Sequence, residues 1–195
     1  MRLLFVCTGN ICRSTMAEGI ARSAISGAYP GQPGPVEVAS AGIAGLDGEE
    51  PTAEAVRAME ERGIDIRGYV AQTVSRSLTA ASDLVLVMEE RQRAHVSALA
   101  GSAVVPVFLL LKLAEVARVV LRAEGHGLDR IGPRALESVV SVATVMERND
   151  AWELPSQQYE VSDPMGMPLE WYIRAADIME IAVGDILEVL LGPSA

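Results

Sequence analysis

Aromatic side chains are scarce in this chain: aromatic residues make up 4% of its 195 residues, whereas hydrophobic residues make up 50%. The chain can therefore bury a core, but that core has to be built mainly from Ala, Val, Leu and Ile. A composition this apolar also excludes an intrinsically disordered chain, because disorder requires fewer apolar residues. The length fits one domain.

Cysteine and histidine are equally rare, with two of each. Cys7 and Cys12 are five residues apart, and two cysteines cannot staple a secreted disulfide scaffold. His95 and His126 lie far apart in the sequence, and no pair among these four residues has the spacing of a zinc ligand set. The sequence therefore implies no metal and no other cofactor.

A long uncharged apolar run is also missing. The longest one, Val104–Leu111, ends at Lys112, whereas a membrane span needs roughly 18 such residues. The apolar start of the chain is too short for a signal peptide, and Arg13 soon follows without a small-residue cleavage site. We therefore expect a cytoplasmic protein without a membrane span.

Basic residues are in the minority, with 16 Lys and Arg against 26 Asp and Glu, a net charge of −10 and a pI near 4.7. Such a chain repels phosphate backbones, which excludes nucleic-acid binding through bulk electrostatics. Any phosphate that it binds must be held by a local arrangement of groups.

Short apolar runs alternate with helical patterns in the first part of the chain. The runs that predict strands are residues 3–6, 36–39, 84–88 and 104–108. Helical patterns cover residues 14–25 and a segment that Pro51 opens and Gly63 ends, with a loop over residues 27–35. Pro106 makes the fourth strand an edge strand. This alternation predicts an α/β fold with an open four-stranded parallel sheet flanked by helices.

The second part of the chain shows helical spacing only. Two patterns cover residues 110–121 and 136–146, and a third, residues 171–191, predicts a long last helix. Glycine and proline residues separate the first two patterns: Gly125, Gly127, Gly132 and Pro133. We predict a single domain over residues 1–195 with a helical insertion at about residues 109–155. The helices after Phe108 either cap the sheet edge or form part of the substrate entrance or a dimer face, with Trp152 and Tyr159 supplying aromatic side chains that the entrance otherwise lacks.

One loop carries the residues that phosphate chemistry needs. Residues 7–14 read Cys-Thr-Gly-Asn-Ile-Cys-Arg-Ser and lie between the first strand and the first helix. Loop N–H groups and a helix N-terminus can converge on an anion in this setting. Arg13 can bind two phosphoryl oxygens, and Gly9 allows a turn that a side chain would hinder. The loop lacks Gly-Lys-Ser/Thr and is therefore not a nucleotide P-loop.

A cysteine that points into such a cradle is expected to be a thiolate, because amide dipoles, an arginine and a hydroxyl all favour the charged form. Ser14 can donate a hydrogen bond to the Cys7 thiolate, which then lies beneath the phosphoryl group for in-line attack at phosphorus. The other predicted phosphate-binding residues come from the same loop: Thr8, Gly9, Asn10, Ile11, Cys12 and Ser14.

Residues 7–14 resemble the signature loop of the low-molecular-weight protein-tyrosine phosphatase family. The resemblance extends to Met16-Ala17-Glu18, Ser40-Ala41-Gly42, Gly63-Ile64-Asp65 and residues 83–88, and it returns at Asp163-Pro164. It thus covers roughly residues 1–108 and 160–191.

The resemblance implies a role for each matched residue. Cys7 is the nucleophile, Arg13 binds the phosphoryl oxygens, and Asp163 is the general acid. Asn10 and Ser14 hold the loop shape and stabilise the thiolate, and Ser40 supports Asn10.

A carboxylic acid on a mobile loop also makes physical sense, because it can protonate the departing oxygen and then activate water. By itself, an Asp-Pro pair is more typical of a turn or a helix cap.

The sequence departs from the family where the substrate enters. Relatives that favour phosphotyrosine carry aromatics after Asp-Pro, but Met165 and Gly166 stand here, and residues 43–48 also lack an aromatic. Tyr69 is nearest to the position of a family histidine. The Asp-Pro-x-Gly pattern resembles the protein-arginine phosphatase branch, whereas Ile11 fits the tyrosine branch.

We predict a phosphomonoesterase that hydrolyses phosphotyrosine in proteins through a phosphocysteine intermediate. The alternatives are a protein-arginine phosphatase, or a phospho-binding or redox-regulatory protein with little turnover. Cys12 is the predicted redox partner of Cys7, whereas an arsenate reductase is disfavoured because no Cys follows Cys12. The expected partner is a phosphorylated protein, and a homodimer is left open.

Overall fold

Four parallel strands form one sheet in the computed structural model, which describes residues 1–28, 30, 34, 36–101, 105–123 and 133–191. In the order β2-β1-β3-β4, the sheet consists of Glu37–Gly42, Arg2–Cys7, Leu84–Val87 and Val107–Leu109. β4 lies at one edge, as Pro106 predicts, because proline has no N–H for a further partner. The predicted open four-stranded parallel sheet is confirmed.

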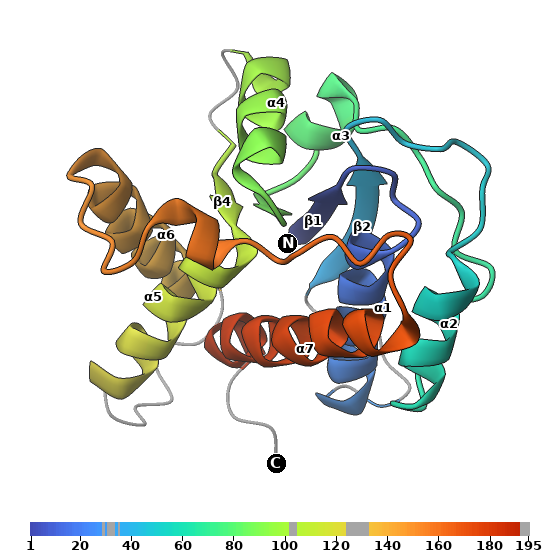
Figure 1. The fold of residues 1–195 in the computed structure, drawn as a ribbon. Helices are drawn as coiled ribbons and strands as arrows, with labels where there is room; N and C mark the ends of the chain where they lie inside the picture. Colours follow the sequence, from blue (N-terminus) through green and yellow to red (C-terminus); the bar gives the residue numbers. More distant parts are fainter. Residues whose placement is uncertain (29, 31–33, 35, 102–104, 124–132, 192–195) are drawn as a thin grey trace.

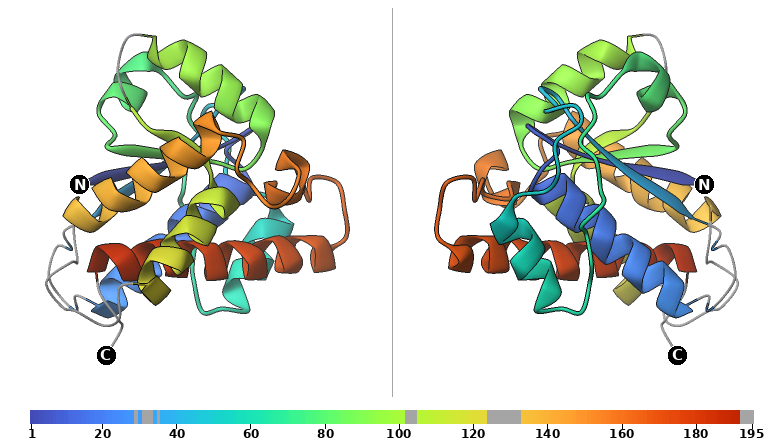
Figure 2. Two further views of the ribbon diagram at one scale, coloured as in Figure 1. Left: turned by 90° about the vertical axis from the view of Figure 1, so that its left-hand side faces the viewer. Right: turned by 90° about the vertical axis from the view of Figure 1, so that its right-hand side faces the viewer.

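Helices cover both faces of the sheet (Figures 1 and 2). Alternate residues of each strand point to opposite faces, so that Leu3 and Phe5 belong to one buried cluster and Leu4 and Val6 to the other. The helices on the first face are α1 (Arg13–Ala28), α2 (Ala53–Glu60), α5 (Leu110–Ala123) and α7 (Leu169–Leu191). Those on the second face are α3 (Arg76–Ala80) and α4 (Glu90–Ala100).

Several element boundaries differ from the prediction. α2 begins at Ala53 rather than at Pro51, because Thr52 caps it by accepting a 3.3 Å hydrogen bond from the Ala55 N–H. α1 continues to Ala28, so Gly27 belongs to the helix and not to the predicted loop. The rest of that loop lies largely outside the described residues, and so does Val104 at the start of the predicted fourth strand.

The helical region after β4 belongs to the same core as the sheet. α5 buries Leu113, Ala114 and Ala117 against α7, and α6 (Pro133–Arg148) packs on α5. Both predicted helical patterns are confirmed, while the separating Gly125, Gly127 and Gly132 lie outside the described residues. Trp152 packs against the buried clusters of both faces, as expected of a segment that caps the sheet edge. Among the described residues, no helix combines the length and apolar character needed to cross a bilayer.

The strand order places a switch point at the carboxyl ends of β1 and β3. The chain leaves β1 for β2 on one side, whereas β3 pairs with β1 on the other side. Open α/β sheets bind ligands at such a point, because the loops that leave the two strands diverge there. The loop after β1 begins at Thr8, and the segment after β3 begins at Met88.

Candidate active site

The loop from Thr8 to Cys12 turns its carbonyl groups away from the centre of the site. The carbonyl oxygens of Cys7, Thr8 and Gly9 accept hydrogen bonds of 3.0–3.1 Å from N–H groups of residues 43, 44 and 46. Those of Ile11 and Cys12 accept from the Thr52 N–H at 2.9 Å and the Thr15 hydroxyl at 2.7 Å. With the acceptors bound outside, the loop N–H groups and the N-terminus of α1 can turn inward, as an anion cradle requires.

The tight turn of this loop is made by Asn10 rather than by Gly9. Asn10 has a φ of 59°, and asparagine is one of the few non-glycine residues that tolerate the left-handed region. Gly9 is not among the residues with positive φ, and a Cβ there would lie 3.4 Å from the Ile11 side chain. The predicted turn-forming role of Gly9 is therefore wrong.

Gly42, at the end of β2, is the glycine that the loop requires. A Cβ on Gly42 would lie 2.4 Å from the Thr8 carbonyl oxygen and 3.0 Å from the Asn10 nitrogen. Both atoms belong to the backbone and cannot rotate away. The absence of a side chain at Gly42 thus allows β2 to approach the phosphate loop closely.

The Asn10 side chain ties this loop to β2. Its Nδ2 donates to Ser14 Oγ at 2.9 Å and to Ser40 Oγ at 2.8 Å, and its Oδ1 accepts from the Gln72 N–H at 2.9 Å. The structure thus places Ser40 against Asn10, as the resemblance implies. Because Asn10 and Ser14 are fully buried, these bonds restrict the loop to one geometry.

Two members of this network are not evident in the sequence. Ser40 Oγ donates to Glu18 Oε2 at 2.6 Å, and Gln72 Nε2 donates to the Ser40 carbonyl at 2.9 Å. Gln72 therefore contacts both Asn10 and Ser40. Tyr69 lies beneath the Arg22 guanidinium, whose Cζ is 5.9 Å from the ring centre. Glu18 belongs to Met16-Ala17-Glu18, a segment that shares the family resemblance, and this was its available signal, but nothing in the sequence singles out Gln72.

Cys7 lies at the floor of the site. Its Sγ is 2.9 Å from Ser14 Oγ and accepts from the Asn10 N–H at 3.3 Å. Both groups can donate to a thiolate and thereby stabilise negative charge on sulfur. Ser14 and Asn10 thus lie where the predicted thiolate needs them.

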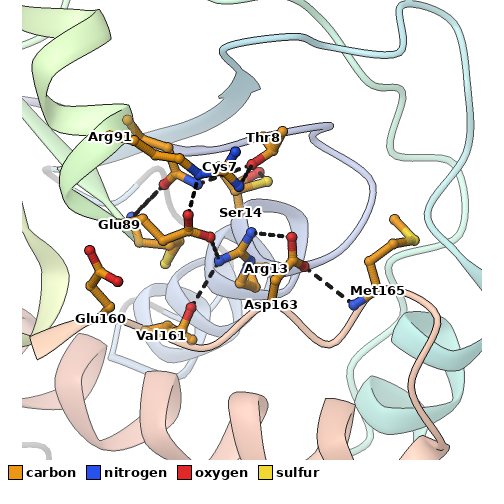
Figure 3. A network of polar contacts seen from close by, with 12 residues as sticks. Cys7, Thr8, Arg13, Ser14, Glu89, Arg91, Glu160, Val161, Asp163 and Met165 are labelled. Atoms are coloured by element: carbon orange, nitrogen blue, oxygen red, sulfur yellow. Dashed lines mark hydrogen bonds and ion pairs between the residues drawn. The ribbon is translucent and has the colours of Figure 1, made fainter. Parts of the chain in front are cut away.

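Arg13 is almost completely buried at 1% exposure and lies among three acceptors (Figure 3). One terminal nitrogen donates to Glu89 and, at 2.8 Å, to the Val161 carbonyl; the other pairs with Asp163 Oδ2 at 2.7 Å. Its Nε–H has no acceptor among the described residues, although Arg13 lines the cavity. A phosphoryl oxygen in the cavity fits this buried donor.

Glu89 follows β3 and was not predicted as a site residue. It pairs with both Arg13 and Arg91. Burial alone would raise the pKa of Glu89, but hydrogen bonds and charge from Arg91 and Arg13 outweigh it and hold this pKa below its usual value. Glu89 is thus a carboxylate at neutral pH and orients the guanidinium of Arg13. Arg91 in turn donates to Thr8 Oγ1 at 3.0 Å, which links the segment after β3 to the phosphate loop.

Asp163 reaches the site from the segment between the 3₁₀ helix η2 (Ser156–Tyr159) and α7. Its side chain is 39% exposed, and besides pairing with Arg13 it accepts from the Met165 N–H at 3.3 Å. The structure therefore brings Asp163, Arg13 and Cys7 to one cavity although 156 positions separate Asp163 from Cys7 in the sequence.

The cavity has a volume of about 210 Å³ and a largely apolar rim. Its lining residues are Cys7, Thr8, Gly9, Ile11, Cys12, Arg13, Ala44, Leu46, Asp163 and Met165. None of these described lining residues is aromatic. Tyr159 is buried and stacks edge-on with Trp152 at 5.6 Å between ring centres, and neither contributes to this lining. The idea that these two rings replace the missing aromatics is therefore wrong for this cavity.

Cys12 is a buried neighbour of the nucleophile candidate. Burial raises the pKa of the Cys12 thiol to about 11, a nearby hydroxyl of Thr52 at 3.4 Å opposes this shift, and the charge of Cys7 adds to it. Cys12 is therefore a neutral thiol at pH 7, and both cysteines are free. In the part of the chain that the structure describes, no group of three His, Cys, Asp or Glu side chains could hold a metal ion.

Comparisons with known proteins agree with this geometry. The model of the family described as low molecular weight phosphotyrosine protein phosphatase matches residues 2–123. A probable low molecular weight protein-tyrosine-phosphatase, EpsP of Ralstonia solanacearum, is 41% identical over 108 residues, which are 55% of this chain and 69% of the relative. Ptp of Acinetobacter johnsonii is 37% identical over 94 residues, 48% of this chain and 61% of the relative.

Solved structures share the fold over nearly the whole chain. The low molecular weight protein tyrosine phosphatase from T. tengcongensis superposes with a TM-score of 0.68 at 29% identity, covering 97% of this chain and 99% of that one. A YwlE arginine phosphatase superposes with a TM-score of 0.66 at 25% identity, covering 96% and 94%. The resemblance seen in the sequence and the expected enzyme class, a phosphoric monoester hydrolase, are confirmed: the chain belongs to the low molecular weight phosphotyrosine protein phosphatase family.

Proposed function

We propose that this chain hydrolyses phosphotyrosine in proteins through a phosphocysteine formed on Cys7. The observation that carries the proposal is the cavity at the end of β1, where Cys7, Arg13 and Asp163 meet above a loop whose carbonyl groups point outward. A thiol, a guanidinium and a carboxyl group around one anion cradle are the groups that phosphoryl transfer to cysteine needs.

In the first step, the Cys7 thiolate attacks phosphorus opposite the ester oxygen. The S–P bond forms while the P–O bond breaks, and Asp163 gives its proton to the leaving phenolate. Arg13 and the loop N–H groups stabilise the charge on the three other phosphoryl oxygens. Asp163 must leave Arg13 for this step, and its exposed side chain on a loop permits the exchange.

In the second step, water replaces cysteine. The Asp163 carboxylate takes a proton from a water molecule whose oxygen attacks phosphorus, and the S–P bond breaks. The products are inorganic phosphate and the regenerated Cys7 thiolate. The hydroxyl of Ser14, 2.9 Å from Sγ, stabilises the sulfur as it departs.

The lining favours an aryl phosphate. Ile11, Leu46 and Met165 offer apolar contacts to a ring, and Ile11 offers no polar partner to a guanidinium. Without aromatic walls, the lost ring packing weakens binding by about 0.5–1.5 kcal/mol. We therefore expect a high KM for phosphotyrosine peptides rather than a low kcat.

A protein-arginine phosphatase is the second candidate. The YwlE arginine phosphatase shares the fold at 25% identity, and Asp163, Pro164 and Gly166 form a pattern like that of the arginine branch. A phospho-binding or redox-regulatory protein with little turnover is the third candidate, which a burst without turnover would support.

A panel of phosphotyrosine, phosphoarginine and phosphoserine peptides tests this proposal. We expect the highest kcat/KM with phosphotyrosine, and Cys7→Ser should abolish hydrolysis while vanadate or phosphate still binds. Met165→Tyr should lower KM for a phosphotyrosine peptide by restoring a ring at the rim. Faster hydrolysis of phosphoarginine by the wild-type protein would contradict the tyrosine assignment.

The proposal also concerns the cell compartment, the partner and the domain organisation of the chain. The reaction needs a free Cys7 thiol, which a reducing cytoplasm preserves. The partner is a phosphorylated protein, and the segment at about residues 109–155 forms a helical insertion within one domain. A homodimer remains a prediction, which light scattering at enzyme concentrations used in assays would check.

A further inference from the structure

A lysine is buried in the helical region, away from the cavity. Lys112 lies on α5, and its side chain is 2% exposed. Its Nζ pairs with Glu147 Oε1 of α6 at 3.0 Å and donates to Ser156 Oγ of the 3₁₀ helix η2 (Ser156–Tyr159) at 3.3 Å. One ammonium group thus joins three elements that lie side by side in Figures 1 and 2.

Two aromatic rings complete the surroundings of this ammonium group. Nζ lies 4.7 Å from the ring centre of Trp152 and 5.9 Å from that of Tyr159. A cation within about 6 Å of a ring centre is attracted by the ring, more strongly when both are desolvated. Glu147, Trp152, Ser156 and Tyr159 together with Lys112 are called the Lys112 cluster below.

The chain runs directly from this cluster to the active site. Tyr159 is followed by Glu160, whose Oε1 accepts from the Glu90 N–H at 2.9 Å. Val161 then donates its N–H to the Met88 carbonyl at 2.9 Å and accepts from Arg13 at 2.8 Å. Asp163 stands two residues later (Figure 3). Only three residues therefore separate Tyr159, whose ring faces Lys112, from Asp163, whose carboxyl group pairs with Arg13.

We propose that the Lys112 cluster positions the segment that presents Asp163 to the leaving group, so that Lys112 is a positioning residue for proton transfer. This inference rests on the proposed function. The four described partners of Lys112 in the cluster do not line the cavity, so Lys112 acts through Tyr159, Glu160 and Val161. The helical region thereby contributes to the chemistry as well as to the cap on the sheet edge.

A buried ammonium group suits this task better than an apolar side chain would. A charge in the interior is tolerated only where its partners are correctly placed, whereas apolar contacts permit several packings of similar energy. The segment after Tyr159 needs such a constraint because its outer residues are exposed: Asp163 at 39% for the side chain, Met165 at 47% and Met167 at 40%.

Leaving-group dependence tests the proposal, because only a poor leaving group needs the proton of Asp163. Wild-type protein, Lys112→Met, Asp163→Asn and their double variant would be assayed for kcat/KM with p-nitrophenyl phosphate and phenyl phosphate. We expect Lys112→Met to lower the value for phenyl phosphate about tenfold more than that for p-nitrophenyl phosphate. In the Asp163→Asn background the extra loss should disappear, since the positioned group is already gone.

Arg118→Met is the matched control. Arg118 is on the same helix and pairs with Asp185 of α7 at 2.7 Å, remote from the acid segment. It should leave the ratio between the two substrates unchanged. If Lys112→Met does not fold, Lys112→Met with Glu147→Gln removes both charges and leaves no unpaired buried ion; this double variant should show the same selective loss.

The outcomes distinguish a failure of the positioning role of Lys112 from a failure of the acid role of Asp163. The positioning role alone is overturned if Lys112→Met, or Lys112→Met with Glu147→Gln, loses kcat/KM equally for both substrates. It is also overturned if the extra loss for phenyl phosphate persists in the Asp163→Asn background. If Asp163→Asn itself loses equally on both substrates, the acid assignment of the proposed function fails, and the positioning role falls with it.

Discussion

The phosphate loop and the acid segment are built in opposite ways. In the phosphate loop, Asn10, Arg13 and Ser14 are at most 1% exposed, and hydrogen bonds from residues 43–46 and from Thr52 fix its backbone. In the acid segment, residues 160–168, the side chain of Asp163 is 39% exposed, and Met165 and Met167 are also exposed.

This difference fits the two tasks of the proposed reaction. Charge stabilisation works best when donors are fixed before the substrate arrives, because nothing then has to reorganise in the transition state. A proton donor must first release Arg13 to the phosphoryl group and then reach the leaving oxygen, which requires freedom to move. Substitutions in the phosphate loop and in the acid segment should therefore change activity and stability in different ways.

Asp163→Asn should produce the largest effect in the acid segment. General acid catalysis contributes about 10²–10⁴-fold, so kcat/KM for phenyl phosphate should fall within that range. The loss for p-nitrophenyl phosphate should be far smaller, because its leaving group departs without a proton. Steady-state kinetics with both esters measures this; equal losses would remove Asp163 from the acid role.

Glu89→Gln should lower the unfolding free energy, because it removes the ion pairs that hold Arg13 and Arg91. A carboxylate that accepts charged hydrogen bonds from Arg13 and Arg91 is replaced by a neutral amide, which should cost about 1–2 kcal/mol at pH 7. The effect depends on pH with a definite sign. Because the pKa of Glu89 is lowered by folding, its stabilisation is complete above its unfolded pKa of about 4.5 and is lost as pH falls through the folded pKa.

Denaturant unfolding of wild type and Glu89→Gln at several pH values from neutral to acid would measure this difference. The gap in unfolding free energy should close on acidification. A gap that stays constant with pH would show that the ion pairs of Glu89 contribute nothing. Glu50→Gln, at an exposed carboxylate outside the helices, is a suitable control.

The sequence predicts the parts of this enzyme that are local. Strand runs such as residues 84–87 are apolar throughout, and the loop at 7–14 contains its own nucleophile, guanidinium and hydroxyl. Those features need no distant partner to be seen. Asp163 is visible too, but only through the family resemblance, because an Asp-Pro pair alone is typical of an ordinary turn.

The contacts that fix the site are long-range, and the sequence does not reveal them. Arg13 and Glu89 are 76 positions apart, and Arg13 and Val161 are 148 apart. The Gln72 contact to Asn10 uses its backbone N–H, which every residue type except proline offers. The Gly9 prediction fails for a related reason: Asn10 also tolerates a left-handed conformation, and only its hydrogen bonds with Ser14 and Ser40 decide which residue adopts it.

Cys12→Ser should affect protection from oxidants rather than turnover. Cys12 lies in the same tight loop as Cys7, and a thiol there can trap a Cys7 sulfenic acid as a disulfide with loss of water. Because its raised pKa of about 11 leaves little thiolate at pH 7, trapping should speed up as pH rises. Activity recovered by dithiothreitol after equal peroxide exposure measures it; full recovery in Cys12→Ser would contradict the protective role.

Gly9→Ala should have the smallest effect, and Gly42→Ala provides its counterpart. The backbone of Gly9 does not require positive φ, and its added Cβ would meet side-chain atoms of Ile11 and Leu46, at 3.4 and 3.7 Å, which is ordinary van der Waals contact. We expect the unfolding free energy of Gly9→Ala to stay within about 0.5 kcal/mol of the wild-type value, with a modest rise in KM because Gly9 is one of the residues that line the cavity. Gly42→Ala places its methyl group 2.4 Å from the Thr8 carbonyl oxygen, so it should lose both stability and kcat. Thermal unfolding and kinetics of the two variants measure this contrast, and a Gly9→Ala protein as damaged as Gly42→Ala would show that the rigidity of the phosphate loop depends on Gly9 after all.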